Sequence, residues 1–373
     1  MVRDGGTMEY RINRKTGDKI SVVGLGTSYI SEASEKDAVE ALVYAHEHGI
    51  NYADLATAGA KTFDYYGKAL GSVRKEMYYQ VHFGANYETG EYGWTTDLNT
   101  VKRSVDGQLK ALRTDYIDYG FIHCMDEESD FDNYRKNGVL QFLLDLKAQG
   151  VVRNVGLSSH TPVVAHKILD AVPVDMLMFS INPGYDYQHG EYAKGSASER
   201  MELYKRCEAE GIGISVMKPF SGGQLLDAKT SPFGESLSKY QCIQYALDKP
   251  SVLTVLPGIR NVEDVRQLLR FFDIPAEEKD YSVIGAFTPK DMNGICVYCN
   301  HCQPCPMGLD IGLINKYYDL ALAGDEMAKD HYQKLSVHAD ACVRCGHCED
   351  RCPFRVKQEK RMEEISQYFK LNS

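Results

Sequence analysis

Two short cysteine motifs near the end of the sequence have the residue types and spacing to hold metal. The first, "CVYCNHCQPCP", runs from Cys296 to Pro306, and "CVRCGHCEDRCP" follows from Cys342 to Pro353. Eight of the eleven cysteines of the chain fall inside these two motifs. Such clustering is typical of metal binding in a cytosolic enzyme, whereas dense disulfides are typical of small exported domains.

The spacing indicates which metal centre the cysteines would hold. Zinc sites use two separated C-x-x-C pairs, but here three cysteines follow one another at three-residue steps in each motif. Such a run supplies three iron ligands of a [4Fe–4S] cluster, and the next cysteine, followed by proline, ligates the other cluster. We therefore predict two [4Fe–4S] clusters, with zinc or disulfides as the alternatives. The predicted ligands are Cys296, Cys299, Cys302 and Cys352 for one cluster, and Cys342, Cys345, Cys348 and Cys305 for the other.

The part of the chain before the cysteine motifs is expected to form the domain that binds a substrate. After a predicted hairpin within residues 9–21, eight short apolar strand candidates from "SVVGLG" to "VLTVLPG" alternate with helical patterns. This rhythm predicts a (β/α)8 TIM barrel, with a doubly wound sheet as the competing architecture. Reactive groups of such barrels lie where the strands end. The candidates at these ends are Asp54, His82, His123, Ser158, Asn182 and Met217.

The pattern changes after the eighth unit, where the chain becomes rich in cysteine. We predict a barrel over residues 8–284 and a small, α-rich ferredoxin-like domain over residues 285–373. The net charge of −10 argues against nucleic acid as a partner. No apolar run reaches the roughly 18 residues that a membrane span needs, and the N-terminus lacks a signal-peptide core. A cytoplasmic protein, suited to reducing or anaerobic conditions, is expected.

Several motifs, in order, resemble the signatures of the aldo/keto reductases. They are "EYRINRKTGDKISVVGLGTS", "GINYADLATA", "TDYIDYGFIHCMD", "DLKAQGVVRNVGLSSH" and "TVLPGIRNVEDV". The likeness extends over nearly the whole chain from Met8. The tail resembles the ferredoxin-type extension of one bacterial branch of that superfamily. The resemblance implies a reductase that works on carbonyls at the mouth of the barrel.

The resemblance carries over only half of the family's catalytic tetrad. Asp54 matches the family's aspartate and His123 its histidine, whereas Gly59 stands where the acidic tyrosine is expected and His82 where the lysine is expected. We predict that His82, favoured as imidazolium by Asp54, donates protons while His123 orients the substrate. Other candidate acids are Tyr65, Tyr66, Tyr185 and Tyr187.

The family also binds a nicotinamide, and part of that pocket is retained. Ser158 and Ser159 occupy its Ser-Asn position, Asn182 matches a carboxamide-binding asparagine, and Met217 stands where a stacking tyrosine is common. At the eighth strand, Gly258 and Arg260 would meet the cofactor phosphates. Asp264 falls where relatives that prefer NADPH place an arginine, so NADH is favoured over NADPH. A flavin is the competing cofactor, because it joins one-electron to two-electron chemistry.

Three functions remain open at this point. The leading one is an iron–sulfur oxidoreductase that reduces or oxidises a small organic substrate, with a ferredoxin or flavodoxin as electron donor. The second is a non-redox lyase, isomerase or hydrolase that uses Asp54, His82 and His123 for acid–base chemistry beside structural clusters. The third is an electron-transfer protein on an inactive barrel. The sequence carries no signal for an oligomeric state.

Overall fold

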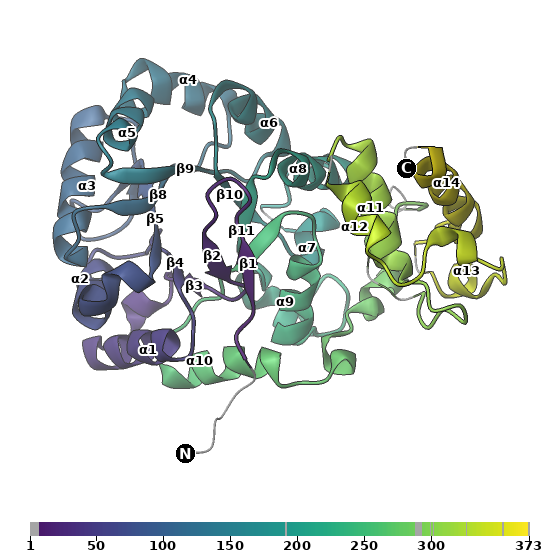
Figure 1. The fold of residues 1–373 in the computed structure, drawn as a ribbon. Helices are drawn as coiled ribbons and strands as arrows, with labels where there is room; N and C mark the ends of the chain where they lie inside the picture. The colour runs from purple at the N-terminus through teal and green to yellow at the C-terminus, as the bar shows by residue number, and fades with distance from the viewer. Residues whose placement is uncertain are drawn as a thin grey trace.

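A closed barrel of parallel strands forms the body of the molecule (Figure 1). The computed structural model describes residues 7–190, 192–287, 293–298, 300, 302–325, 327–352 and 354–371. Among these residues, eight parallel strands pair side by side in chain order. They are β3 (Leu25–Gly26), β4 (Tyr52–Asp54), β5 (Tyr78–Phe83), β8 (Ile117–Ile122), β9 (Val152–Ser158), β10 (Met176–Ser180), β11 (Gly213–Met217) and β12 (Val252–Val255).

Backbone hydrogen bonds between the first and last strands close the barrel. The Val255 N–H donates to the Val22 carbonyl at 3.0 Å, and the Gly24 N–H donates to the Val255 carbonyl at 2.9 Å. The predicted hairpin forms as the antiparallel pair β1 (Tyr10–Ile12) and β2 (Lys19–Ser21). The eight predicted strands and the barrel architecture are therefore confirmed, and the doubly wound alternative is wrong because an open sheet lacks the closing pair.

A ring of helices covers the outside of the barrel (Figure 1). They are α1 (Glu35–Glu47), α2 (Lys61–Leu70), α3 (Leu98–Leu112), α4 (Glu128–Lys136), α5 (Val139–Ala148), α6 (Pro162–Ala171), α8 (Ala197–Glu210), α9 (Lys239–Leu247) and α10 (Val262–Leu269). The short, buried α7 (Pro183–Asp186) directly follows β10. The ends of the helices follow local signals. In α8, for example, Ser196 and Glu199 form a reciprocal capping box, and Gly211 ends the helix with a φ of +72°. In the described part of the chain, no helix is both long and apolar enough to cross a membrane.

The C-terminal region lies outside the ring of helices, beside α8 (Figure 1). It contains α11 (Ile311–Leu322), α12 (Ala328–Gln333), α13 (His347–Arg351) and α14 (Gln358–Leu371), packed around an apolar cluster of its own. Asp319 of α11 joins this region to the barrel. It accepts a hydrogen bond from Tyr298 at 2.7 Å, and it pairs with Arg361 of α14 and with Lys205 of α8.

A buried charge cluster holds the segment that follows β10. The Arg200 side chain is fully buried, and its Nε donates to Asp186 Oδ1 at 2.8 Å. The hydroxyls of Tyr204 and Tyr245 donate to the same carboxylate, each at 2.8 Å. Because Asp186 belongs to α7, this cluster fixes one wall of the barrel mouth.

Removal of the buried cation should destabilise the protein strongly. We expect Arg200→Met to lower the free energy of unfolding by about 3–5 kcal/mol, because the Asp186 carboxylate would stay buried without its counter-charge. Urea unfolding followed by circular dichroism measures the change. The control is Arg260→Met, since the exposed pair of Arg260 with Glu32 should contribute less than about 1 kcal/mol. Equal losses in the two variants would contradict this account.

Candidate active site

Four polar side chains form a continuous hydrogen-bonded chain from the barrel interior to its mouth. Asp54 Oδ1 lies 2.8 Å from His82 Nε2, and His82 Nδ1 lies 2.8 Å from His123 Nδ1. His123 Nε2 in turn lies 2.8 Å from the hydroxyl of Tyr92. The structure thus brings together the three predicted residues and adds a tyrosine to them.

The hydrogen-bond partners of each residue determine which atom carries each proton in this hydrogen-bonded chain of side chains before reaction. The Asp54 carboxylate can only accept, so His82 donates to it from Nε2. His82 Nδ1 then accepts from His123 Nδ1, and His123 Nε2 accepts from the Tyr92 hydroxyl. Burial and the neighbouring His82 and His160 hold the pKa of His123 well below its usual range. His82 is fully buried, so it lies behind His123 as seen from solvent.

Gln80 anchors the inner end of this chain. Its Nε2 donates to Asp54 Oδ1 at 3.2 Å, while its Oε1 accepts from the hydroxyls of Tyr52 at 2.7 Å and Ser215 at 2.9 Å. All of these residues are buried inside the barrel. The carboxylate therefore has a single orientation, which a buried and fully bonded polar network enforces.

Tyr92 reaches the site from a small hairpin that follows β5. The hairpin pairs β6 (Ala85–Asn86) with β7 (Gly93–Trp94), and Tyr92 lies directly before β7. Its backbone N–H donates to the Ala58 carbonyl at 3.1 Å, and Trp94 Nε1 donates to the His123 carbonyl at 3.3 Å. Partial burial, with Cys124 and Asp126 nearby, raises the pKa of the Tyr92 hydroxyl, so it stays protonated.

The hairpin packs against the loop in which the family's tyrosine is expected. Gly59 of that loop pairs with Glu91 in an antiparallel bridge, so the shortened loop brings Tyr92 over the mouth. Sequence reasoning missed Tyr92, because nothing local marks it. The one feature of the sequence that could have indicated Tyr92 is the shortened loop around Gly59, because a shorter loop leaves room for a neighbouring segment at the barrel mouth. The tyrosines proposed from the sequence, Tyr65, Tyr66, Tyr185 and Tyr187, are all buried.

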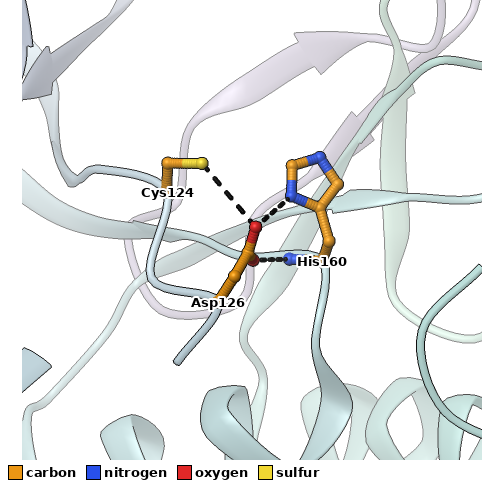
Figure 2. Close-up of side chains that lie close together, drawn as sticks. All are labelled: Cys124, Asp126 and His160. Carbon is orange, nitrogen blue, oxygen red and sulfur yellow. Dashed lines mark hydrogen bonds and ion pairs between the residues drawn. The ribbon is translucent and has the colours of Figure 1, made fainter. Parts of the chain in front are cut away.

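Three further donor groups gather beside this chain. Cys124 and Asp126 lie in the loop after β8, and His160 lies in the loop after β9 (Figure 2). His160 Nδ1 lies 2.9 Å from Asp126 Oδ2, and the Cys124 thiol donates to the same oxygen at 3.8 Å. Burial and the Asp126 carboxylate raise the pKa of Cys124 to about 12.

The residues predicted to hold a nicotinamide ring lie at the same mouth but are largely engaged with their own protein. Asn182 donates from Nδ2 to the Lys218 carbonyl at 2.8 Å and accepts the Tyr185 N–H at 2.9 Å. Ser159 Oγ donates to the Thr161 carbonyl at 3.3 Å. Ser158 and Met217 are buried. This donor set fits the family's way of holding a carboxamide poorly.

The predicted phosphate end lies near the start of α10. Arg260 Nε lies 3.1 Å from Glu32 Oε2, and its guanidinium covers the ring of Tyr29 at 4.3 Å. A Cβ at Gly258 would meet Tyr29 Cδ2 at 2.3 Å, so only glycine allows this approach. The Arg260 N–H donates to Asp264 Oδ2 at 2.8 Å. The arginine therefore stands between two carboxylates.

In the C-terminal region, the four predicted ligands of one cluster line a common pocket. They are Cys305, Cys342, Cys345 and Cys348. The other lining residues of this pocket are mostly apolar, such as Leu309, Ile311 and Met362. A pocket lined by four cysteines and by mostly apolar side chains has the donor set that a cubane cluster needs. No disulfide joins the cysteines that the structure describes.

The second predicted set lies closer to the barrel. Cys296 and Cys352 pack against the main barrel core, and Cys302 is buried in the core of the C-terminal region. The Val356 N–H donates to Cys352 Sγ at 3.4 Å, a bond that would stabilise a thiolate at this sulfur. Cys299 lies outside the described residues.

Comparison with known proteins agrees with this fold. A family model described as "Aldo/keto reductase family" matches residues 22–241, more than half of the chain. The uncharacterized oxidoreductase YqkF of Bacillus subtilis is 25% identical over 268 residues, which cover 66% of this chain and 86% of that protein. L-galactose dehydrogenase of Arabidopsis thaliana is 25% identical over 295 residues, which cover 70% of this chain and 86% of the plant protein.

Solved structures show the same barrel. The holo form of aldo-keto reductase AKR11C1 from Bacillus halodurans superimposes with a TM-score of 0.61 at 22% identity, covering 76% of this chain and 97% of that one. An aldo-keto reductase from Klebsiella pneumoniae, solved in complex with NADPH, gives a TM-score of 0.55 at 16% identity over 78% and 97% of the two chains. With a matching family model over most of its barrel, this chain belongs to the aldo/keto reductase family.

Proposed function

We propose that the protein is an iron–sulfur oxidoreductase that reduces a small carbonyl compound at the barrel mouth, with Tyr92 as the proton donor. The chain from Asp54 through His82 and His123 to Tyr92 is the observation that carries this proposal. Tyr92 is 44% exposed, whereas the two histidines are buried, so the hydroxyl is the member that a substrate can touch. The tyrosine that the family places after the second barrel strand is replaced by one from the hairpin after the third.

The chain can deliver one proton without leaving any group in an unpaired charged state. When His82 carries an extra proton, the Asp54 carboxylate pairs with it, and His123 holds its own proton on Nε2. Tyr92 then gives its proton to the substrate oxygen and takes the Nε2 proton of His123. His123 Nδ1 in turn takes the Nδ1 proton of His82, and His82 returns to the neutral form. Oxidation of an alcohol would run the same steps in reverse.

The C-terminal region supplies electrons in this proposal. Bound [4Fe–4S] clusters would supply single electrons, and reduction of a carbonyl to an alcohol takes two electrons and two protons. The proton on oxygen would come through Tyr92, and the proton on carbon would come from water at the exposed barrel mouth. The residues present fit such clusters, because four cysteines line one mostly apolar pocket. Tyr187, at the C-terminal end of α7, lies with its ring 6.3 Å from Phe354, two residues beyond Cys352. The barrel mouth and the cysteine region thus share a packed boundary.

Family membership supports a second candidate, in which a nicotinamide supplies a hydride. The residues expected to bind the nicotinamide carboxamide are already hydrogen-bonded within the protein, so the structure gives this candidate less support. The residues at the predicted phosphate end favour NADH over NADPH. Glu32 and Asp264 would repel the negatively charged 2′-phosphate of NADPH, whereas NADH has an uncharged 2′-hydroxyl at this position.

Loss of the Tyr92 hydroxyl should slow turnover. We expect Tyr92→Phe to lower kcat by about 10²–10⁴-fold, the range of a lost general acid, with a small change in KM. The measurement is the rate at which carbonyl substrates reoxidise the dithionite-reduced protein under strict anaerobic conditions, followed in the visible spectrum.

Tyr87→Phe is the matched control, because the Tyr87 hydroxyl donates to the Thr57 carbonyl and its ring packs against Tyr92. This variant perturbs the same hairpin but leaves the proton chain intact. Equal kcat values for the Tyr92→Phe and Tyr87→Phe enzymes would contradict the assignment of Tyr92 as the proton donor.

Iron content tests the cluster assignment directly. Anaerobically purified protein should hold about eight irons per chain. Cys345→Ser should lose about one to four of them, since one cluster would lack a ligand. Cys242→Ala, which removes a buried thiol of α9, should keep the full count. Zinc in place of iron, or equal iron in both variants, would contradict the prediction.

Titration with reduced nicotinamides tests the second candidate. We expect NADH to bind about tenfold more tightly than NADPH, and Glu32→Gln to raise the affinity for NADPH by a few-fold. Isothermal calorimetry measures both. Tighter binding of NADPH would refute the preference, and the absence of binding by either nucleotide would remove the candidate.

A further inference from the structure

The cluster of Cys124, Asp126 and His160 has no role in the proton chain. One ligand atom from each residue lies within 4.8 Å of the other two (Figure 2). A thiolate, a carboxylate and an imidazole are all zinc ligands. The two loops that carry them follow adjacent strands, β8 and β9, so the barrel itself sets their separation.

The spacing is close to that of a metal site. Zinc bonds of roughly 2.0–2.3 Å in a tetrahedron place ligand atoms about 3.3–3.8 Å apart. Cys124 Sγ lies 3.8 Å from Asp126 Oδ2, which agrees. Asp126 Oδ2 and His160 Nδ1 lie 2.9 Å apart, as expected while a proton occupies the place of the cation. The thiolate and carboxylate charges would together neutralise a divalent ion.

The imidazole is well placed to act as a ligand. His160 is 5% exposed, and Nδ1 is the ring nitrogen that faces the Asp126 carboxylate (Figure 2). The other ring nitrogen, Nε2, points away from the cluster and has no hydrogen-bond partner within the described part of the chain. The contact with Asp126 is therefore what orients the ring, and a metal ion could take the place of the Nδ1 proton.

Hydrogen bonds to the other carboxylate oxygen, Oδ1, fix the orientation of Asp126. Asp126 Oδ1 accepts the backbone N–H of His160 at 2.6 Å and the Ser159 hydroxyl at 3.5 Å. This leaves Oδ2 directed at the thiol and the ring. Such outer contacts orient a metal ligand before the ion arrives.

We propose that Cys124, Asp126 and His160 bind one divalent transition metal, zinc by preference, at the barrel mouth. Three protein ligands leave a fourth position open, as in catalytic zinc sites. Cys124 directly follows His123, the partner of Tyr92, and Cys124 and Asp126 act electrostatically on the Tyr92 hydroxyl, so the metal site and this hydroxyl are neighbours. A substrate oxygen held at the open position would be polarised toward protonation. This catalytic role rests on the proposed reductase function, whereas the metal binding does not.

The test measures zinc in the iron-loaded protein, so that the cluster cysteines are already occupied. The anaerobic holoprotein is incubated with zinc chloride, desalted and analysed by plasma mass spectrometry. Crystals are measured above and below the zinc absorption edge, which separates zinc from iron. We expect about one zinc per chain, with its anomalous peak between the three side chains.

Conservative variants keep the proposal falsifiable. Cys124→Ser and His160→Gln should each reduce bound zinc at least about tenfold while iron content and circular dichroism stay unchanged. Cys242→Ala should retain the zinc, because that thiol has no ligand neighbours in the described structure. Equal zinc in all variants, or a zinc peak elsewhere, would overturn the site. Loss of zinc with unchanged turnover would overturn only its catalytic role, and an unaffected Tyr92→Phe enzyme that still binds zinc would overturn only the proposed reaction.

Discussion

The contact between the Asp54 carboxylate and His82, buried inside a closed barrel, is the interaction on which the site depends. A carboxylate without water must be met by donors, and here His82 and Gln80 supply them. Once Asp54 accepts from His82 Nε2, the other nitrogen of a neutral His82 accepts a hydrogen bond, and this requirement determines the proton positions on His123 and Tyr92 in the resting protein. One buried charge therefore orients three further side chains of the proton chain, His82, His123 and Tyr92, which come from three different segments.

The barrel makes this alignment possible because parallel strands end side by side. Asp54, His82 and His123 come from β4, β5 and the end of β8, which are neighbours in the sheet. If His82 stands at the family's lysine position, as the sequence motifs imply, a chain of hydrogen bonds would take the place of the charge pair of the usual tetrad. A lysine carries a fixed positive charge, whereas a histidine passes a proton from one ring nitrogen to the other. In the proposed assignment, the loss of one tyrosine and the placement of another would be parts of one rearrangement, in which the loop after β4 pairs with the next hairpin.

In the proposed reaction, the two ends of the molecule would divide the chemistry between them. The barrel mouth gathers groups that can hold or pass protons, while four cysteines of the C-terminal region line a mostly apolar pocket. Asp319 and the Phe354–Tyr187 contact fasten these parts together, so the region with the cysteines has a defined position against α7 and α8. A fixed separation is what electron transfer between such centres would require.

Sequence alone determined the barrel, because eight apolar runs at strand length, each followed by a helical pattern with its own end signals, leave few other architectures. It also indicated Asp54, His82 and His123, since strand ends are local features that a motif marks. Tyr92 and the grouping of Cys124 and Asp126 with His160 were decided only by the tertiary structure. Their partners lie about 30 residues away along the chain, and no periodicity records which loops meet over a barrel mouth. Local sequence sets where each strand ends, but side-chain contacts between loops depend on loop length and packing, which become visible only when the barrel closes.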